Sequence, residues 1–150
     1  MKELKTYISE GFFSNVGANN PIKPVIDAIK DASINDKIKS DDKRLKFRDS
    51  LAVVLKDLEI GIKKGGKLTF EYIRNIGNVS SKITISLEIT KSNYARWIYS
   101  DEKGNYENDA YYIAFNIASD LYYGTKYPAQ DPKLRHSIAN TIKVIEFKLS

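Results

Sequence analysis

Three features of the chain could support phosphate or acid–base chemistry. Gly61 to Lys67 matches the start of a phosphate-binding loop, Gly-x4-Gly-Lys, but Leu68 stands where a Ser or Thr should hold magnesium. His136 is the only histidine, so a two-histidine metal site is excluded and acid–base work would need a carboxylate partner. The chain has no cysteine, which excludes thiol catalysis and zinc–thiolate sites. We therefore predict no catalytic residue, no metal site and no cofactor.

Aromatic residues are concentrated between positions 94 and 127. Tyr and Trp combine a large rigid contact area with a polar group, which is typical of surfaces that bind proteins. With basic neighbours they could also stack nucleic-acid bases, and the third interpretation is packing in the core or along the edge of a small sheet. The candidate partner-binding residues are Tyr94, Trp97, Tyr99, Tyr122 and Tyr123.

The first eleven residues have a pattern of their own. Leu4, Tyr7 and Ile8 would lie on one side of a short helix, and the pattern ends at Glu10 and Gly11. The motif Met-Lys-x-Leu-x-x-Tyr-Ile-x-Glu, followed by a small residue, resembles the capsid-targeting leader of internal head proteins in T-even-type tailed bacteriophages. The alternative is a short N-terminal helix that docks on the domain.

The resemblance implies a route into a virus particle. In that family the leader docks the protein into the assembling prohead, and the maturation protease cuts after a Glu that has an aliphatic residue two positions before it. Ile8, Glu10 and Gly11 fit this rule. Residues 1–10 are then a cleavable leader, and the prohead scaffold and the maturation protease are partners. The implied location is the capsid interior of the virion, and the host cytoplasm before assembly or after injection.

The resemblance does not specify what the body of the protein does. Cargo in the family ranges from passive DNA-associated filler to proteins that disarm host defences, so packaged DNA and a host protein are both expected partners. The second hypothesis is a small non-enzymatic adaptor or inhibitor that binds a partner through the Tyr/Trp-rich face. A hydrolase or nucleotide-binding enzyme is disfavoured by the missing motifs.

Composition sets further bounds. The 150 residues suit one domain, and a chain of this length buries enough surface to fold without a disulfide or metal. No apolar run approaches the roughly 18 residues that span a bilayer, so we expect no membrane partner. The net charge of +5 favours polyanions through counterion release, an effect that does not depend on sequence. We therefore expect any DNA binding to be weak and non-specific.

Two helices are predicted before the aromatic region. Residues 11–20 are rich in Gly and Asn and indicate a linker, and the apolar spacing from Pro21 predicts a helix over 21–32. Ser40 or Asp41 should cap a longer helix that Gly65 and Gly66 end, with basic residues in its last turn. The apolar stripe predicted for this helix is Leu45, Leu51, Val54, Leu55, Leu58 and Ile62.

The pattern then changes to the alternation typical of strands. Apolar and polar residues alternate from Lys67 to Tyr72 and from Ile83 to Thr90 around a turn near Gly77, which predicts an antiparallel hairpin. A third strand is expected over 94–100, with a short fourth strand near Tyr106.

The last third of the chain predicts one helix and leaves one segment open. Asn108 or Asp109 should cap a helix that ends near Gly124. A final helix is predicted from Asp131 to about Asn140, and the last ten residues fit either a helix or an edge strand. The expected fold is α+β, an antiparallel three- to four-stranded meander covered on one face by helices, over residues 21–150.

Overall fold

A computed structural model describes residues 21–148 of the protein. The predicted leader, the cleavage-site residues Ile8, Glu10 and Gly11, and the 11–20 linker lie outside the described residues. The elements in chain order are α2 (Lys23–Ile34), α3 (Asp41–Gly61), β1 (Lys67–Ile76), β2 (Val79–Ile89), β3 (Ala95–Asp101), β4 (Gly104–Asn108), α4 (Ala110–Lys126), two 3₁₀ turns at Pro132–Leu134 and Ile138–Asn140, and β5 (Lys143–Lys148).

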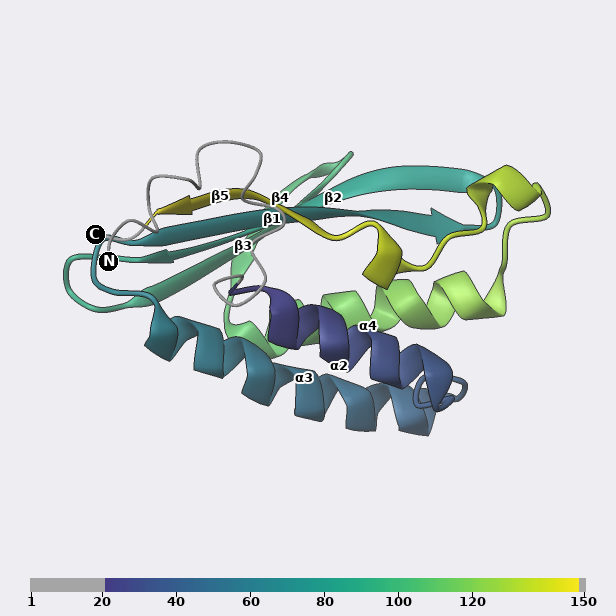
Figure 1. The fold of residues 1–150 in the computed structure, drawn as a ribbon, viewed down its shortest axis with the longest axis horizontal. Coiled ribbons are helices and arrows are strands. Elements are labelled where there is room, and N and C mark those ends of the chain that lie inside the picture. The colour runs from purple at the N-terminus through teal and green to yellow at the C-terminus, as the bar shows by residue number, and fades with distance from the viewer. Residues whose placement is uncertain (1–20, 149–150) are drawn as a thin grey trace.

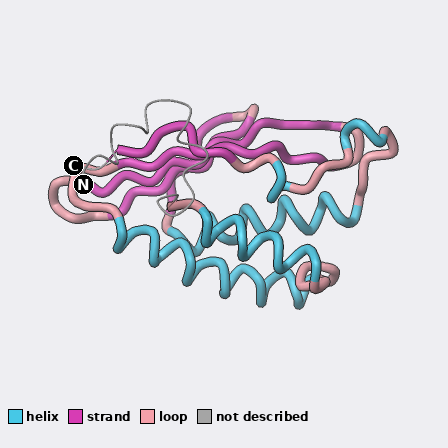
Figure 2. Tube along the Cα trace, viewed as in Figure 1, coloured by secondary structure: helices cyan, strands magenta, loops and turns pink. Residues whose placement is uncertain are grey.

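The strands form one antiparallel sheet in the order β4-β3-β2-β1-β5. Strands β1 to β4 make the predicted meander, and β5 joins it beside β1. Helices α2, α3 and α4 lie on the same side of the sheet (Figure 1), and the tube trace shows the same two layers (Figure 2). The predicted α+β class, with helices packed on an antiparallel sheet, is confirmed, and β5 adds one strand to the expected three or four.

Alternation of side chains builds the inner face of the sheet. Leu68, Phe70 and Tyr72 on β1 are buried and pair with Leu87, Ile85 and Ile83 on β2. Successive side chains on a strand point to opposite faces, so the Lys, Thr and Glu residues between them face away from the helices. The turn that joins the two strands contains Gly77 at a φ of +61°, a left-handed conformation that glycine adopts without steric cost.

Side-chain caps begin the two long helices. The Ser40 hydroxyl accepts a hydrogen bond from the Lys43 N–H at 3.2 Å, and the Asp109 carboxylate accepts one from the Tyr112 N–H at 2.9 Å. Both caps satisfy a backbone donor that the helix itself leaves free. One predicted member of the α3 stripe is wrong, because Leu45 is one-third exposed and Phe47 is buried in its place.

Helix α3 ends earlier than predicted. It stops at Gly61, so Gly65 and Gly66 follow the helix and do not cap it. These glycines instead form the turn into β1: Gly65 has a φ of +81°, and the Gly65 N–H and Gly66 carbonyl bond to the backbone of Ile89. A side chain at position 66 would meet the Ile62 side chain at 2.6 Å, which explains a glycine there.

The predicted helix from Asp131 to Asn140 is also wrong. Two short 3₁₀ turns occupy this stretch, and the open segment after it is the edge strand β5. Arg135 donates hydrogen bonds to the carbonyls of Ala129 and Gln130, which folds the chain back on itself before a helix could propagate. The backbone of Lys143–Lys148 pairs with β1, so sheet pairing decided between the two alternatives.

Candidate functional site

Helices α3 and α4 pack against each other in opposite directions (Figure 1). Arg44, in the first turn of α3, places its guanidinium carbon 4.7 Å from the Tyr122 ring centre and 5.7 Å from those of Phe115 and Tyr123. A guanidinium over several ring faces is attracted by their negative potential, most strongly when water is excluded. The Arg44 side chain is only 14% exposed, so this stacking holds it in one orientation.

The polar contacts of Arg44 are incomplete. Its one ion pair in the described part of the chain is with Asp41, at 3.5 Å. Its Nε and the Ser119 Oγ are the two buried side-chain polar atoms of residues 21–148 that lack a hydrogen-bond partner. Ser119 lies one helical turn from both Phe115 and Tyr122, on the same side of α4. Unmet hydrogen-bonding capacity is therefore concentrated where the two helices meet.

The surface around this point is rich in exposed tyrosines. The Arg48 guanidinium lies 4.5 Å from the Tyr111 ring centre, and the Lys126 ammonium lies 5.6 Å from Tyr122 and 5.8 Å from Tyr127. The surface combines aromatic residues with cations held over them, and we call it the Arg–Tyr face. Its residues are Arg44, Arg48, Tyr111, Tyr112, Phe115, Tyr122, Tyr123, Lys126 and Tyr127.

The five candidate partner-binding residues do not lie together. Tyr122 and Tyr123 belong to the Arg–Tyr face, with Tyr122 nearly buried and Tyr123 38% exposed. Trp97 and Tyr99 point into the core from β3. Tyr94 is exposed and lies beside the C-terminal end of α3. At about 1.5 Å of rise per residue, that end is about 22 Å along the helix from Arg44.

Buried polar partners explain why two of these aromatic residues are internal. The Trp97 indole N–H donates to the Glu59 carboxylate at 2.6 Å, and the Tyr99 hydroxyl donates to Asp120 at 2.9 Å. Each ring buries its apolar surface while its polar atom is satisfied. The sequence places these residues on a strand but does not show which acids will meet them.

Seven members of the Arg–Tyr face were absent from the candidate set: Arg44, Arg48, Tyr111, Tyr112, Phe115, Lys126 and Tyr127. One sequence signal could have found some of them. Arg44 and Arg48 are four residues apart, as are Tyr123 and Tyr127, which places each pair on one side of its helix. The sequence does not show that α3 packs against α4, and it is this packing that brings the arginines and the tyrosines together.

A buried polar network lies on the other side of α4. The Asp120 carboxylate accepts hydrogen bonds from Tyr72 at 2.7 Å and Tyr99 at 2.9 Å, and its second oxygen lies 3.6 Å from Arg74. Arg74 also donates to the Tyr99 hydroxyl and to Glu102. The network joins α4 to β1 and β3 through a single carboxylate.

Burial shifts the titration of this network. It raises the pKa of Asp120 to about 6, although the hydrogen bonds from Tyr72 and Tyr99 and the charge of Arg74 act in the opposite direction. Burial also raises the pKa of Tyr72 well above its ordinary value. Every oxygen of Asp120 has a protein partner, so we interpret the group as a structural connection between layers.

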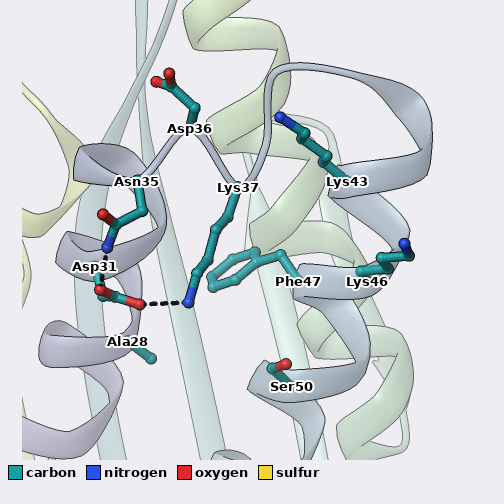
Figure 3. Close-up of a pocket in the computed structure, with 9 residues that line it drawn as sticks. All are labelled: Ala28, Asp31, Asn35, Asp36, Lys37, Lys43, Lys46, Phe47 and Ser50. Atoms are coloured by element: carbon teal, nitrogen blue, oxygen red, sulfur yellow. Dashed lines mark hydrogen bonds and ion pairs between the residues drawn. The ribbon is translucent and has the colours of Figure 1, made fainter.

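A cavity of about 400 Å³ lies between α2 and α3 (Figure 3). The Phe47 ring forms one wall, and three lysines and two aspartates surround the opening. Lys37 is paired with Asp31 at 2.6 Å, and Asn35 also bonds to Asp31. Lys46 pairs with Asp42 on the preceding turn of α3. The lining of this cavity therefore contains both acidic and basic side chains.

The stretches singled out for phosphate and acid–base chemistry lie apart. Gly61 to Lys67 joins the end of a helix to the start of a strand, the reverse of a phosphate-binding loop. His136 is half-buried between the two 3₁₀ turns. Residues 21–148 hold no group of three or more side chains arranged to bind a metal ion. None of the helices in that range is long and apolar enough to cross a membrane.

The chain was compared with models of known protein families, with curated protein sequences and with solved structures, and none of them matches it. The chemistry of the Arg–Tyr face therefore has to be inferred from its own residues. Tyr and Arg, which make up most of this face, are among the residues enriched at the hot spots of protein interfaces.

Proposed function

We propose that the protein is an internal head protein of a tailed bacteriophage, carried into the capsid by residues 1–10 and trimmed after Glu10. The observation that carries this proposal is the sequence Ile8-Ser9-Glu10-Gly11 at the end of a ten-residue leader pattern. The trimmed body is packaged with DNA and delivered to act on a host target.

The extent of the core supports a detachable leader. Buried hydrophobic residues from Ile22 to Phe147 form one cluster that includes side chains from the sheet and all three helices. A domain that fills its core in this way does not need an additional short helix to close it. Thermal melts of the full chain and of residues 11–150 test this point, and we expect the two melting temperatures to agree within about 10 °C.

We propose that the body acts by binding and not by catalysis. The Arg–Tyr face supports this role because its rings and arginines are held rigidly by packing, which lowers the entropy lost on association. Association with packaged DNA would be sequence-independent, since the net charge of +5 is spread over the whole chain.

Processing by the maturation protease is the decisive experiment. The protein is co-expressed with the protease of its own phage, and the intact mass is measured. We expect a product that begins at Gly11. The variants Glu10→Gln and Ile8→Asp should stay full length, because the first removes the recognised charge and the second places a charge in an apolar pocket.

A matched control is Ser9→Ala, which lies between the two recognised positions and should still be trimmed. If the unmodified protein stays full length beside an active protease, or if both blocking variants are trimmed, the capsid-cargo proposal fails. The second candidate function then stands, an adaptor or inhibitor that works through the Arg–Tyr face without processing. The specific observation in its favour is the stacked Arg44 with unmet hydrogen-bonding capacity.

A further inference from the structure

One end of the Arg–Tyr face contains a small cavity of about 250 Å³. It lies between the segment that precedes α3 and the last turns of α4. Ile38 is buried there, Tyr122 supplies an aromatic wall, and Lys39 and Lys126 bring two ammonium groups. A concave site with an apolar wall and convergent polar groups has the general features of a binding pocket.

The charge of this cavity is unbalanced. No acidic residue lines it, whereas the cavity between α2 and α3 contains aspartates beside its lysines. Lys39 pairs with Asp36 at 3.1 Å, but both side chains are more than half exposed, and such surface pairs are weak. Lys126 has no carboxylate within ion-pairing distance in the part of the chain that the structure describes. Its neighbours are Tyr122 and Tyr127, which raise its pKa together with the more distant Asp41 carboxylate.

Two stacked rings beside the cavity form a fixed platform. Tyr123 and Tyr127 are nearly parallel, with an interplanar angle of 9°, and are 38% and 50% exposed. The Tyr127 carbonyl accepts a hydrogen bond from the Gly77 N–H, which ties the end of α4 to the β1–β2 turn. The Asn78 side-chain oxygen accepts hydrogen bonds from backbone N–H groups of the loop that follows α4. The platform is therefore already ordered before anything binds.

We propose that this end of the Arg–Tyr face binds an acidic segment of a protein partner. A carboxylate of the partner enters the cavity between Lys39 and Lys126, and a neighbouring apolar or aromatic side chain packs on Tyr123 and Tyr127. The complement is acidic because the lining supplies two cations and no anion. It is amphipathic because the cations lie directly beside exposed rings. The inference rests on the proposed role of the Arg–Tyr face as a binding surface.

A protein partner fits the observations better than a nucleic acid. Nucleic-acid affinity depends on neutralising several phosphates along the strand. The Arg44 and Arg48 side chains are 14% and 19% exposed, and each already pairs with an aspartate of α3. Two lysines are then left to meet phosphates. Tyr and Arg with few free charges are instead the composition of the centre of a protein interface.

The test uses a defined probe and the full-length protein. The acetylated peptide amide Glu-Glu-Phe-Glu is titrated into isotopically labelled protein, and backbone amide signals are followed by NMR at about 150 mM salt. We expect saturable shifts confined to residues 38–48 and 119–130. The uncharged peptide Gln-Gln-Phe-Gln has the same size, and we expect it to bind at least about tenfold more weakly if the cavity recognises carboxylates.

Two charge reversals localise the effect. Lys126→Glu should weaken binding of the acidic peptide at least about tenfold, because it places a like charge beside the incoming carboxylate. Lys82→Glu makes the same change on the opposite side of the molecule, at a side chain that is 66% exposed, and should leave the dissociation constant within about twofold. A circular-dichroism melt of each variant confirms that it is folded.

Three results would overturn the inference: no saturable shift with the acidic peptide, equal binding of the acidic and uncharged peptides, or equal loss in the two lysine variants. An oligothymidylate of about 12 nucleotides is the competing probe. If the oligothymidylate shifts the signals of the same residues and binds more tightly than the acidic peptide, the face binds single-stranded nucleic acid and the protein-partner inference is wrong. Leader trimming depends on Ile8 and Glu10, so Lys126→Glu should leave it unchanged, and the two proposals can fail separately.

Discussion

The two faces of the molecule hold their charges in different ways. On the sheet face that points away from the helices, Glu71 lies between Lys82 at 3.7 Å and Lys143 at 3.2 Å, and Arg96 lies between Glu88 and Glu107. On the Arg–Tyr face, cations lie over aromatic rings. The outer sheet face satisfies its own charges, whereas the Arg–Tyr face leaves part of its hydrogen-bonding capacity unused.

The register of the strands explains this difference. Phe70, Tyr72, Trp97 and Tyr99 all share the inner face, so the outer face receives mainly the polar members of each alternating pair, with Ile73 and Ile98 as exceptions. Residues directly opposite on neighbouring strands can pair by charge. Helix α4 has no such strict alternation, and its wide aromatic surface cannot be covered by α3 alone. An exposed aromatic surface of this kind is where a binding partner is expected.

The largest expected effect comes from the carboxylate that joins the two layers. Asp120→Ala removes the acceptor for Tyr72, which is fully buried, and leaves Arg74 without that counter-charge. We expect the free energy of unfolding to fall by about 3 kcal/mol or more, measured by urea denaturation at neutral pH. Asp120→Asn keeps an acceptor oxygen and should lose less. Equal stability of the alanine variant and the unmodified protein would show that the layers hold together without this network.

The same residue should make stability depend on pH. Because the folded-state pKa of Asp120 is about 6, above its ordinary value of 3.8, the folded protein holds this proton more tightly than the unfolded chain. The stabilisation that comes from this tighter proton binding is fully present below about pH 4 and is lost as the pH rises through about 6. Between about pH 4.5 and 7.5, the unmodified protein should lose about 2 kcal/mol relative to Asp120→Asn. Parallel pH profiles for the two proteins would contradict this expectation.

A matched pair of arginines compares the two faces directly. Arg44→Ala removes a nearly buried cation from three rings and should cost about 1–2 kcal/mol, whereas Arg96→Ala removes an exposed arginine that is paired with two glutamates and should cost clearly less. Chemical denaturation with urea at low and at about 1 M salt separates the mechanisms, since salt screens exposed charges. The effect of Arg44→Ala should persist in salt. If the two variants respond alike, the contrast between the faces is wrong.

The smallest effect is expected within the outer sheet face. Thr69 and Ser86 share a hydrogen bond of 3.2 Å between their hydroxyls across β1 and β2. Thr69→Val removes that bond but keeps the shape and strand preference of the side chain, and Ser86 is partly exposed and can bond to water. We expect a change within about 0.5 kcal/mol in the same urea assay. A loss above about 1.5 kcal/mol would show that this face depends on its hydroxyl pairs.

Local patterns were sufficient for most elements of the fold. Ser40 and Asp109 begin the long helices as expected from their capping chemistry, and the alternation around Gly77 predicted the β1–β2 hairpin. These features depend on residues close together in the chain, so the sequence determines them directly. The helical class of α4 and the antiparallel meander followed from the same short-range signals.

Tertiary contacts decided the rest. The segment before β5 could have continued as a helix, and Arg135 binding to the preceding loop and strand pairing with β1 settled its structure. The same holds for the aromatic residues: Trp97 and Tyr99 became core because Glu59 and Asp120 lie opposite them. Tyr123, beside Arg44, and Tyr127, stacked on Tyr123, remained at the surface. A tyrosine has the same chemistry in both places, and its burial depends on partners that lie far away in the chain and reach it only through folding.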